Sequence, residues 1–509
     1  MHSGNVGWGY EDVLHYFKKS ENNTDEDIIK DKRYHSVGGY LDVGRYPYQD
    51  KNVPVLINAY KELGYSEVDC NADNVTGVML SQATQRNGER MSTNRAFLEP
   101  VRHLRKNLTI VNNVRVTKVL IDPVNKKAYG VEYAHEKRRN STGMVFASKE
   151  VIVSGGTVNS PQLLMLSGIG PKEVLQELNI TVIQDLRVGE NLQDHASVKC
   201  LNFNLSENAS TVPTKEKFKA DVQKYIELQR NGSLSGPGVY QIQGHLKSRY
   251  IPEAEDYPDI QHFMRSKFPS EDPTECTTNF TTPLSYYNII TYLPTLLRPE
   301  SRGYITINST CPFDPPLIYP NYFNHRRDLE VIIDALNIVV NVSKTNALKS
   351  AGISLNTTGV DLCKYYKYGT DDYWICLARN YTQPMSHPAG TCKMGPSCDP
   401  GAVVDPRLKV HGVKSLRVAD ASVMPLVVSG NLNAAVIMIA EKCADIIKCD
   451  HHKCTAERKP NRKTNRKVSD SITCEMKSIE SQVMSNRSES GLLRGCTVLN
   501  HTCEVVVPY

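Results

Sequence analysis

Long apolar runs are missing from this chain of 509 residues. No run approaches the ~20 apolar residues that cross a bilayer, so we expect no membrane span. The first residues also lack the basic stretch and apolar core of a signal peptide. Hydrophobic residues nevertheless make up 40% of the chain, which is enough for a sizeable core and excludes a disordered protein.

Several familiar metal and catalytic motifs are missing as well. The 14 cysteines do not form paired C-x-x-C sets, so we expect no metal site. No G-x-S-x-G, Walker A or H-E-x-x-H motif occurs, which argues against an α/β-hydrolase, a P-loop enzyme and a zinc protease.

A strong charge of one sign is missing too. The 60 Lys and Arg against 55 Asp and Glu give a net charge of +5, too small to indicate a nucleic-acid partner. Residues 450–467 hold seven Lys or Arg and two acids, and this excess equals the whole net charge. We therefore predict that 449–509 is a basic, disordered tail.

Asn-x-Ser/Thr sequons, in contrast, are abundant. The chain holds about fifteen of them, including those at Asn22, Asn107, Asn140, Asn179, Asn231, Asn308, Asn341 and Asn380. Such sites are typical of surface loops in secreted proteins, although loops rich in Asn and Thr would produce the same pattern. We expect a secreted, extracellular protein whose signal peptide precedes Met1.

Hydrophobic periodicity divides the chain into α/β stretches around a different middle part. Helical spacing predicts helices at 10–20, 53–64, 327–343 and 433–447. Apolar runs between turn residues predict a β-meander from strands at 108–111, 114–120 and 130–133, and further strands at 150–154 and 415–419. The α/β texture fills 1–199 and returns at 381–448, so one domain is expected from two separated stretches, with a second domain at 200–380.

Four segments carry the most specific signal, and they lie at 155–171, 188–195, 386–395 and 416–435. Together they resemble the glucose–methanol–choline family of FAD-dependent alcohol oxidoreductases. Residues 299–303 and 314–322 look most like its insect glucose dehydrogenase (FAD, quinone) branch. The resemblance implies an α/β fold of two domains, with an FAD-binding Rossmann-like domain and a discontinuous substrate domain built on an antiparallel sheet with helices.

The resemblance also implies a catalytic pair. His387 matches the family's catalytic histidine, and a histidine suits the removal of a hydroxyl proton near neutral pH. Asn431 matches its partner position, where an amide would orient the alcohol. Asn431 also suits a turn in its Ser-Gly-Asn context, and both roles can coexist.

Flavin contacts follow from the same resemblance. Val116 matches the position near adenine, and Ser154 and Gly155 lie at the tip of the next strand. Asp420 and Ala421 end a strand, where open α/β sheets bind ligands. Asn433 and Ala434 match the helix start near the isoalloxazine, although Ala435-Val436 replaces the family's usual Pro-Thr.

One family motif does not occur in the chain. FAD binding begins with strand, G-x-G-x-x-G and helix, and no such motif is found. We therefore expect an incomplete FAD-binding domain, whose first βαβ unit precedes Met1. In our preferred interpretation the chain is part of a secreted FAD-dependent dehydrogenase of alcohols or sugars, with a quinone-like electron acceptor. In the alternative, it is a flavin-free pseudoenzyme that acts as a binding or scaffold protein.

Overall fold

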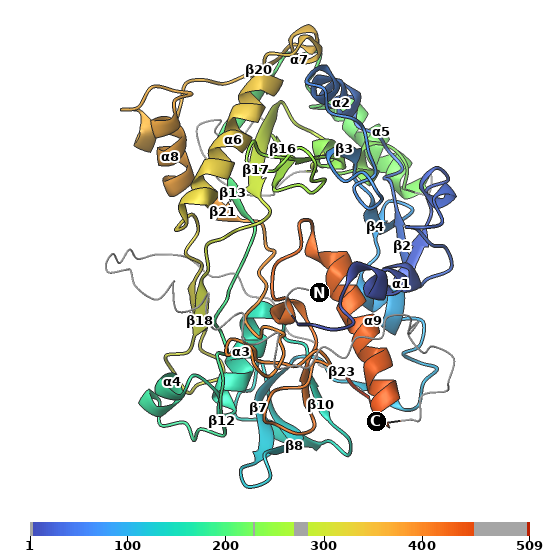
Figure 1. Cartoon of the computed structure of the whole chain (residues 1–509). Helices are drawn as coiled ribbons and strands as arrows, with labels where there is room; N and C mark the ends of the chain where they lie inside the picture. Colours follow the sequence, from blue (N-terminus) through green and yellow to red (C-terminus); the bar gives the residue numbers. More distant parts are fainter. Residues whose placement is uncertain (1–3, 228–229, 269–282, 452–505, 509) are drawn as a thin grey trace.

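The computed structural model describes residues 4–227, 230–268, 283–451 and 506–508 (Figure 1). Two lobes are visible. The upper one is built on a large antiparallel sheet, and the lower one contains a parallel strand pair, a three-stranded sheet and helix α3. Within these residues, no helix is long and apolar enough to cross a membrane.

An antiparallel sheet forms the upper lobe. Its order is β20 (Ile353–Leu355), β14 (Leu201–Leu205), β17 (Ile289–Leu296), β16 (Ile260–Lys267), β15 (Ile242–Leu246) and β3 (Gly77–Leu80). A further strand, β13 (Ala196–Val198), pairs with β17 and with β21 (Thr382–Pro384). The central strands β16 and β17 are buried along their whole length, so the sheet is covered on both faces.

The two faces of this sheet differ in polarity. Ile260 and Met264 belong to the apolar core, where helix α6 (Arg326–Val342) contacts β16 and β17. Because strand side chains alternate between faces, Gln261 and Arg265 point to the opposite side. Both are buried, at 0% and 4% exposure. The sheet therefore presents buried polar side chains on the face away from its apolar core.

The lower lobe joins segments that are far apart in the sequence. Strand β10 (Val151–Val153) pairs in parallel with β22 (Leu416–Val418), and helix α3 (Gly156–Leu166) follows β10 directly. Beside them lies the antiparallel sheet β7 (Val114–Asp122), β8 (Lys127–His135) and β9 (Thr142–Phe146). Two residue ranges separated by more than 260 positions thus build one small α/β unit.

Helix α9 (Leu432–His451) packs along α1 (Tyr10–Ser20), and Lys19 bridges them with an ion pair to Glu441 at 2.7 Å. The other helices are α2 (Val53–Glu62), α4 (Lys172–Glu177), α5 (Lys215–Glu227), α7 (Asn346–Ala351) and α8 (Asp371–Asn380). The other strands are β1 (Glu21–Asn23), β2 (Leu41–Gly44), β4 (Ala83–Arg86), β5 (Glu89–Arg90), β6 (Leu108–Ile110), β11 (Ile169–Gly170), β12 (Gln184–Asp185), β18 (Tyr304–Thr306), β19 (Leu317–Tyr319) and β23 (Val506–Pro508).

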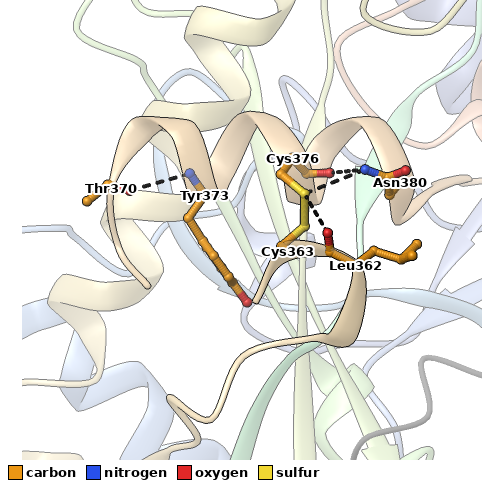
Figure 2. The surroundings of a disulfide bond; sticks show 6 residues. All are labelled: Leu362, Cys363, Thr370, Tyr373, Cys376 and Asn380. Atoms are coloured by element: carbon orange, nitrogen blue, oxygen red, sulfur yellow. Dashed lines mark hydrogen bonds between the residues drawn. A yellow bond between two sulfur atoms is a disulfide. The ribbon is translucent and has the colours of Figure 1, made fainter. Parts of the chain in front are cut away.

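A disulfide fixes helix α8 to the segment before it (Figure 2). Cys363 and Cys376 are bonded, and Thr370 caps the helix by accepting a hydrogen bond from the backbone N–H of Tyr373. Cys200, Cys398 and Cys449 are disulfide-bonded as well. The chain therefore carries covalent cross-links of the kind found in oxidising compartments.

Most predicted elements are confirmed, and two assignments are corrected. The four predicted helices appear as α1, α2, α6 and α9, and the strand predicted at 150–154 appears as β10. The strand at 108–111 was wrongly placed in the meander, because β6 pairs with β23, while β9 supplies the meander's third strand. Residues 53–80, which we placed with the first α/β stretch, instead pack in the upper lobe, where α2 joins the core and β3 pairs with β15.

The predicted tail at 449–509 lies largely outside the described residues. Residues 449–451 complete α9, and 506–508 pair with β6. The prediction of disorder falls on 452–505 and 509, which the structure does not describe.

A buried arginine on β22 yields a stability prediction. Arg417 is 1% exposed and donates to Glu150 at 2.7 Å, to the carbonyl of Arg407 at 2.7 Å and to Asp450 at 2.5 Å. Arg417→Met leaves the buried Glu150 carboxylate without this partner. We expect a loss of about 3–5 kcal/mol in the free energy of unfolding, measured by urea denaturation.

The exposed ion pair between Lys30 and Asp27 offers the control, because Lys30→Ala removes a pair that water already screens. Equal stability of the Arg417→Met variant and the wild type would contradict the structural role of Arg417.

Candidate active site

Two loops from distant parts of the sequence, at 189–195 and 385–391, are joined by backbone hydrogen bonds. The N–H of Gln193 donates to the carbonyl of Ala389 at 3.0 Å, and the N–H of Ala389 donates back to Gln193 at 2.8 Å. The N–H of Gly189 donates to Thr391, and that of Met385 donates to His195. These backbone hydrogen bonds form a ladder that continues the pairing of β13 with β21. Residues 385–391, which follow β21, therefore lie opposite residues 189–195, which precede β13.

The ladder brings His387 against a second histidine, His195. Their Nδ1 atoms are 3.0 Å apart, and the rings meet edge to face. The other ring nitrogen of His195, Nε2, lies 3.0 Å from the carbonyl oxygen of Val428. His195 is completely buried, whereas His387 is half-buried.

Both histidines are held in the neutral form. Burial lowers the pKa of His387 to about 4. Burial and the nearby His387 lower the pKa of His195 to about 3. A neutral imidazole carries a lone pair on one of its ring nitrogens, and that nitrogen is able to accept a proton.

Asp194 fixes the backbone at His387. Its Oδ1 accepts the N–H of His387 at 2.9 Å, and its Oδ2 accepts the hydroxyl of Tyr322 at 2.8 Å. Burial raises the pKa of Asp194 to about 6. Ser386 precedes His387 with φ of 59°, a left-handed backbone that non-glycine residues seldom adopt. Asp194 therefore helps hold a strained turn that aims the His387 ring.

Asn431 is tied to the polar face of the upper sheet. The amide nitrogen of Gln261 lies 3.1 Å from Asn431 Oδ1, 3.1 Å from His245 Nε2 and 3.0 Å from Gln243 Oε1. Because Oδ1 accepts from Gln261, the Nδ2 hydrogens of Asn431 face elsewhere. Asn431 is exposed, so these hydrogens are accessible to a ligand.

The histidine pair and the asparagine network lie within electrostatic reach of each other. Protonation of His245 would lower the pKa of His195, and His195 contacts Val428, three residues before Asn431. The predicted catalytic residues His387 and Asn431 thus belong to one region, where the polar face of the upper sheet meets the loops at 189–195 and 385–391.

Three of the predicted cofactor residues gather in a separate cavity of the lower lobe. Val116, Ser154 and Gly155 line a cavity of about 200 Å³, together with Asn159 and Gln162. Its other walls are largely aliphatic and come from Val114, Val131, Val145, Val153, Leu163 and Leu166. An apolar slot at the carboxyl end of β10 suits a flat aromatic ring such as adenine.

The remaining four lie outside that cavity. The Asp420 carboxylate accepts from Gly156 N–H at 2.9 Å, Ser160 Oγ at 2.6 Å and Ser422 N–H at 2.8 Å. It therefore joins the end of β22 to the start of α3, and Ala421 follows it at the same strand end. Asn433 and Ala434 are exposed in the first turn of α9, where backbone N–H groups lack helical partners. Their contacts with a flavin stay predictions.

These features are compatible with FAD. The aliphatic cavity accommodates an adenine-like ring, and the open first turn of α9 offers backbone donors to a polar group. Within the described residues, no cluster of three or more His, Cys, Asp or Glu is arranged to hold a metal ion.

Four residues of this region were not singled out from the sequence. His195 and Asp194 end the segment 188–195, which the sequence analysis quoted without assigning their roles. Gln261 and His245 lie on buried strands β16 and β15. In β15, polar residues alternate with Ile242, Gly244 and Leu246, which was a signal for His245, whereas β16 holds several polar residues and gave no such signal for Gln261.

Comparison with known proteins settles the family. Profiles described as GMC oxidoreductase match residues 1–197 and 299–440. The chain belongs to the GMC oxidoreductase family. Its fold is the mixed α/β fold of that family, with an FAD-binding domain and a substrate domain.

Individual relatives agree. A glucose dehydrogenase [FAD, quinone] of Drosophila pseudoobscura pseudoobscura is 42% identical over 446 residues, which cover 87% of this chain and 69% of the relative. An ecdysone oxidase of Spodoptera littoralis is 34% identical, covering 87% of this chain and 72% of the relative. The structure of an FAD-dependent oxidoreductase from Chaetomium thermophilum matches with a TM-score of 0.74 and 25% identity, covering 88% of this chain and 82% of that one.

The buried neutral histidines predict how stability depends on pH. Burial lowers the pKa of His262 to about 3 and of His245 to about 4, as it also lowers the pKa of His195 and His387. An unfolded histidine titrates near 6.5, so the unfolded chain binds more protons below that pH. Stability should therefore fall as the pH drops from about 6.5 toward 4. Burial raises the pKa of Asp194, Asp50 and Asp259, and these three carboxyl groups act in the opposite direction to the four histidines.

Urea denaturation at pH 7 and pH 5 measures this effect, and we expect a lower midpoint at pH 5. His262→Gln should reduce the pH dependence by about one proton, or about 1.4 kcal/mol per pH unit. Midpoints that do not change with pH would contradict the assignment of neutral buried histidines.

Proposed function

We propose that this GMC oxidoreductase is an FAD-dependent dehydrogenase that oxidises the CH–OH group of a sugar and passes electrons to a quinone-like acceptor. The proposal is supported by the family, by the similarity to glucose dehydrogenase [FAD, quinone] and by the geometry around His387. In it, His387 is the catalytic base, and Asn431 orients the alcohol.

The observation that carries the proposal is the state of the His387 ring. Its Nδ1 faces His195, and no hydrogen bond from another described residue engages Nε2. Burial keeps the imidazole neutral. A positioned, neutral histidine with one ring nitrogen available is the arrangement needed to take a hydroxyl proton.

Asn431 supplies the complementary donor. Gln261 occupies Oδ1, so the amide hydrogens on Nδ2 are directed toward the ligand side. They would hydrogen-bond the alcohol oxygen and stabilise the negative charge that develops as its proton leaves. When bound, the flavin supplies the acceptor for the hydride, which no protein side chain provides. Val116, Ser154 and Gly155 would hold its adenine end, and Asn433 and Ala434 would lie near its ring system.

A substrate rich in hydroxyl groups suits the polar face of the sheet. Gln261 Oε1 and His245 Nδ1 are buried and make no hydrogen bond with any described residue. Buried polar atoms of this kind cost free energy unless a partner satisfies them. Sugar hydroxyls both donate and accept, so they would satisfy both atoms.

Replacement of the base tests the proposal. We expect His387→Asn to lower kcat by about 10²- to 10⁴-fold with unchanged flavin absorbance, measured with glucose as donor and a quinone as acceptor. In the wild type, kcat/KM should fall as the pH drops through about 4, because His387 then becomes protonated at rest.

His411→Asn is the matched control. His411 is a half-buried histidine bonded to the carbonyl of Gly395, outside this region. Full activity of His387→Asn would contradict the assigned base. A colourless wild-type chain that binds sugar without oxidising it would instead support the flavin-free binding protein.

We also propose that the protein is secreted and glycosylated. Seven of the eight named sequon asparagines are exposed, and only Asn22 is half-buried. The Cys363–Cys376 disulfide supports the same compartment, since such bonds persist in oxidising environments.

Expression through a secretory host with an added leader peptide tests this proposal. We expect N-glycosidase treatment to lower the apparent mass, and Asn107→Gln to remove one glycan's share of that shift. The absence of any shift would contradict the proposal.

A further inference from the structure

His195 connects the proposed base to a backbone carbonyl. Its Nε2 lies 3.0 Å from the oxygen of Val428, and its Nδ1 lies 3.0 Å from Nδ1 of His387. Its exposure is 0%. Both ring nitrogens therefore have a hydrogen-bond partner, and the backbone of Leu297 offers a further acceptor close to the ring.

The carbonyl determines where the proton on His195 lies. A carbonyl oxygen only accepts hydrogen bonds, so Nε2 of His195 has to be the N–H that donates to Val428. In a neutral imidazole the second nitrogen then carries the lone pair. Nδ1 of His195 is consequently an acceptor, and the low pKa of the buried ring keeps it so.

The same logic extends one ring further. An acceptor at Nδ1 of His195 requires a donor 3.0 Å away, so Nδ1 of His387 carries the proton of that ring. The lone pair of neutral His387 is then on Nε2, the nitrogen that no described residue engages. If His387 were instead the Nε2–H tautomer, the Nδ1 lone pairs of the two rings would face each other in a buried setting, which costs free energy.

We propose that His195 is a positioning residue that sets the tautomer of His387. The Val428 carbonyl keeps the proton of His195 on Nε2, so that Nδ1 of His195 accepts a hydrogen bond from Nδ1–H of His387. The proposal rests on the assignment of His387 as the base, and it adds the reason why Nε2 is ready to accept a proton. His195 touches neither substrate nor flavin in this account, so its contribution is made through His387 alone.

The arrangement also confines the proton once it is taken. When Nε2 of His387 accepts the hydroxyl proton, the ring becomes cationic and its Nδ1–H donates more strongly to His195. The proton does not move on to Nδ1 of His195, because the deeper burial of His195 gives that ring the lower pKa, about 3 against about 4 for His387. It stays on His387, from which it returns to solvent or product as the neutral ring is restored.

Nitrogen-15 NMR of the full chain labelled at histidine tests the tautomers directly, whether or not the protein turns over. The His387 and His195 signals are assigned from the His387→Asn and His195→Gln spectra. We expect Nδ1–H for His387 and Nε2–H for His195 in the wild type. An Nε2–H tautomer of His387 in the wild type would overturn the proposal.

Two variants separate tautomer control from simple packing. His195→Gln keeps an oxygen that accepts from His387 and an N–H group that donates to Val428, so the His387 tautomer and activity within about tenfold of wild type should survive. His195→Leu fills similar space without an acceptor. We expect it to shift His387 toward the Nε2–H form and to lower kcat by at least about tenfold, as a wrongly placed proton blocks the base.

His262→Gln is the control for the loss of a buried histidine. His262 is also 0% exposed and has both ring nitrogens bonded, to Tyr60 and to the carbonyl of Ala335, but it lies in the core of the upper lobe. This variant should leave the His387 signals unchanged. An unchanged His387 tautomer in His195→Leu would overturn the proposal while leaving the function of the base intact. A wild type with the expected tautomers but no alcohol oxidation would reject the proposed function instead.

Discussion

The backbone ladder between the loops at 189–195 and 385–391 is the constraint on which the candidate active site depends. Strands β13 and β21 pair antiparallel, with Ala196 opposite Pro384. His195 immediately precedes β13, and the chain that leaves β21 leads to His387. In an antiparallel pair, the residues that precede one strand lie beside the residues that follow the other. The ladder thus places two histidines 192 positions apart at hydrogen-bond distance.

The large antiparallel sheet supports this region because its two faces have different roles. One face packs against α6 and gives the upper lobe its apolar core. The other buries Gln261 and His245, and Gln261 bonds both His245 and Asn431, which precedes α9. Burial of unsatisfied polar atoms is unfavourable, and proteins tolerate such a cost mainly at functional sites. The apolar face offsets this cost.

The sequence was informative where periodicity or family motifs carry the signal. The amphipathic patterns of α1, α2, α6 and α9 were sufficient to find these helices. The strand at 108–111 was misplaced because its apolar pattern fits any strand and does not specify its partner. Similarly, α2 and β3 were grouped with the wrong domain, since their contacts with the upper lobe involve residues more than 100 positions away.

The candidate site shows the same limit at the level of single residues. His387 and Asn431 came from motif resemblance, and the structure places them in one region. Their partners His195 and Gln261 were not assigned roles from the sequence, because a histidine in a loop or a glutamine in a strand acquires a role only from its neighbours in space. Hydrogen-bond partners separated by more than 150 residues are set by strand pairing, which one sequence does not reveal.

The central claim is that Nε2 of His387 is the atom that receives the hydroxyl proton. The most direct measurement is a crystal structure of the flavin-loaded protein with a slowly reacting alcohol. We expect the hydroxyl oxygen within about 2.6–3.2 Å of Nε2 of His387, with the Asn431 amide as its second partner. An alcohol bound with its hydroxyl group away from His387, or against His245 alone, would contradict it.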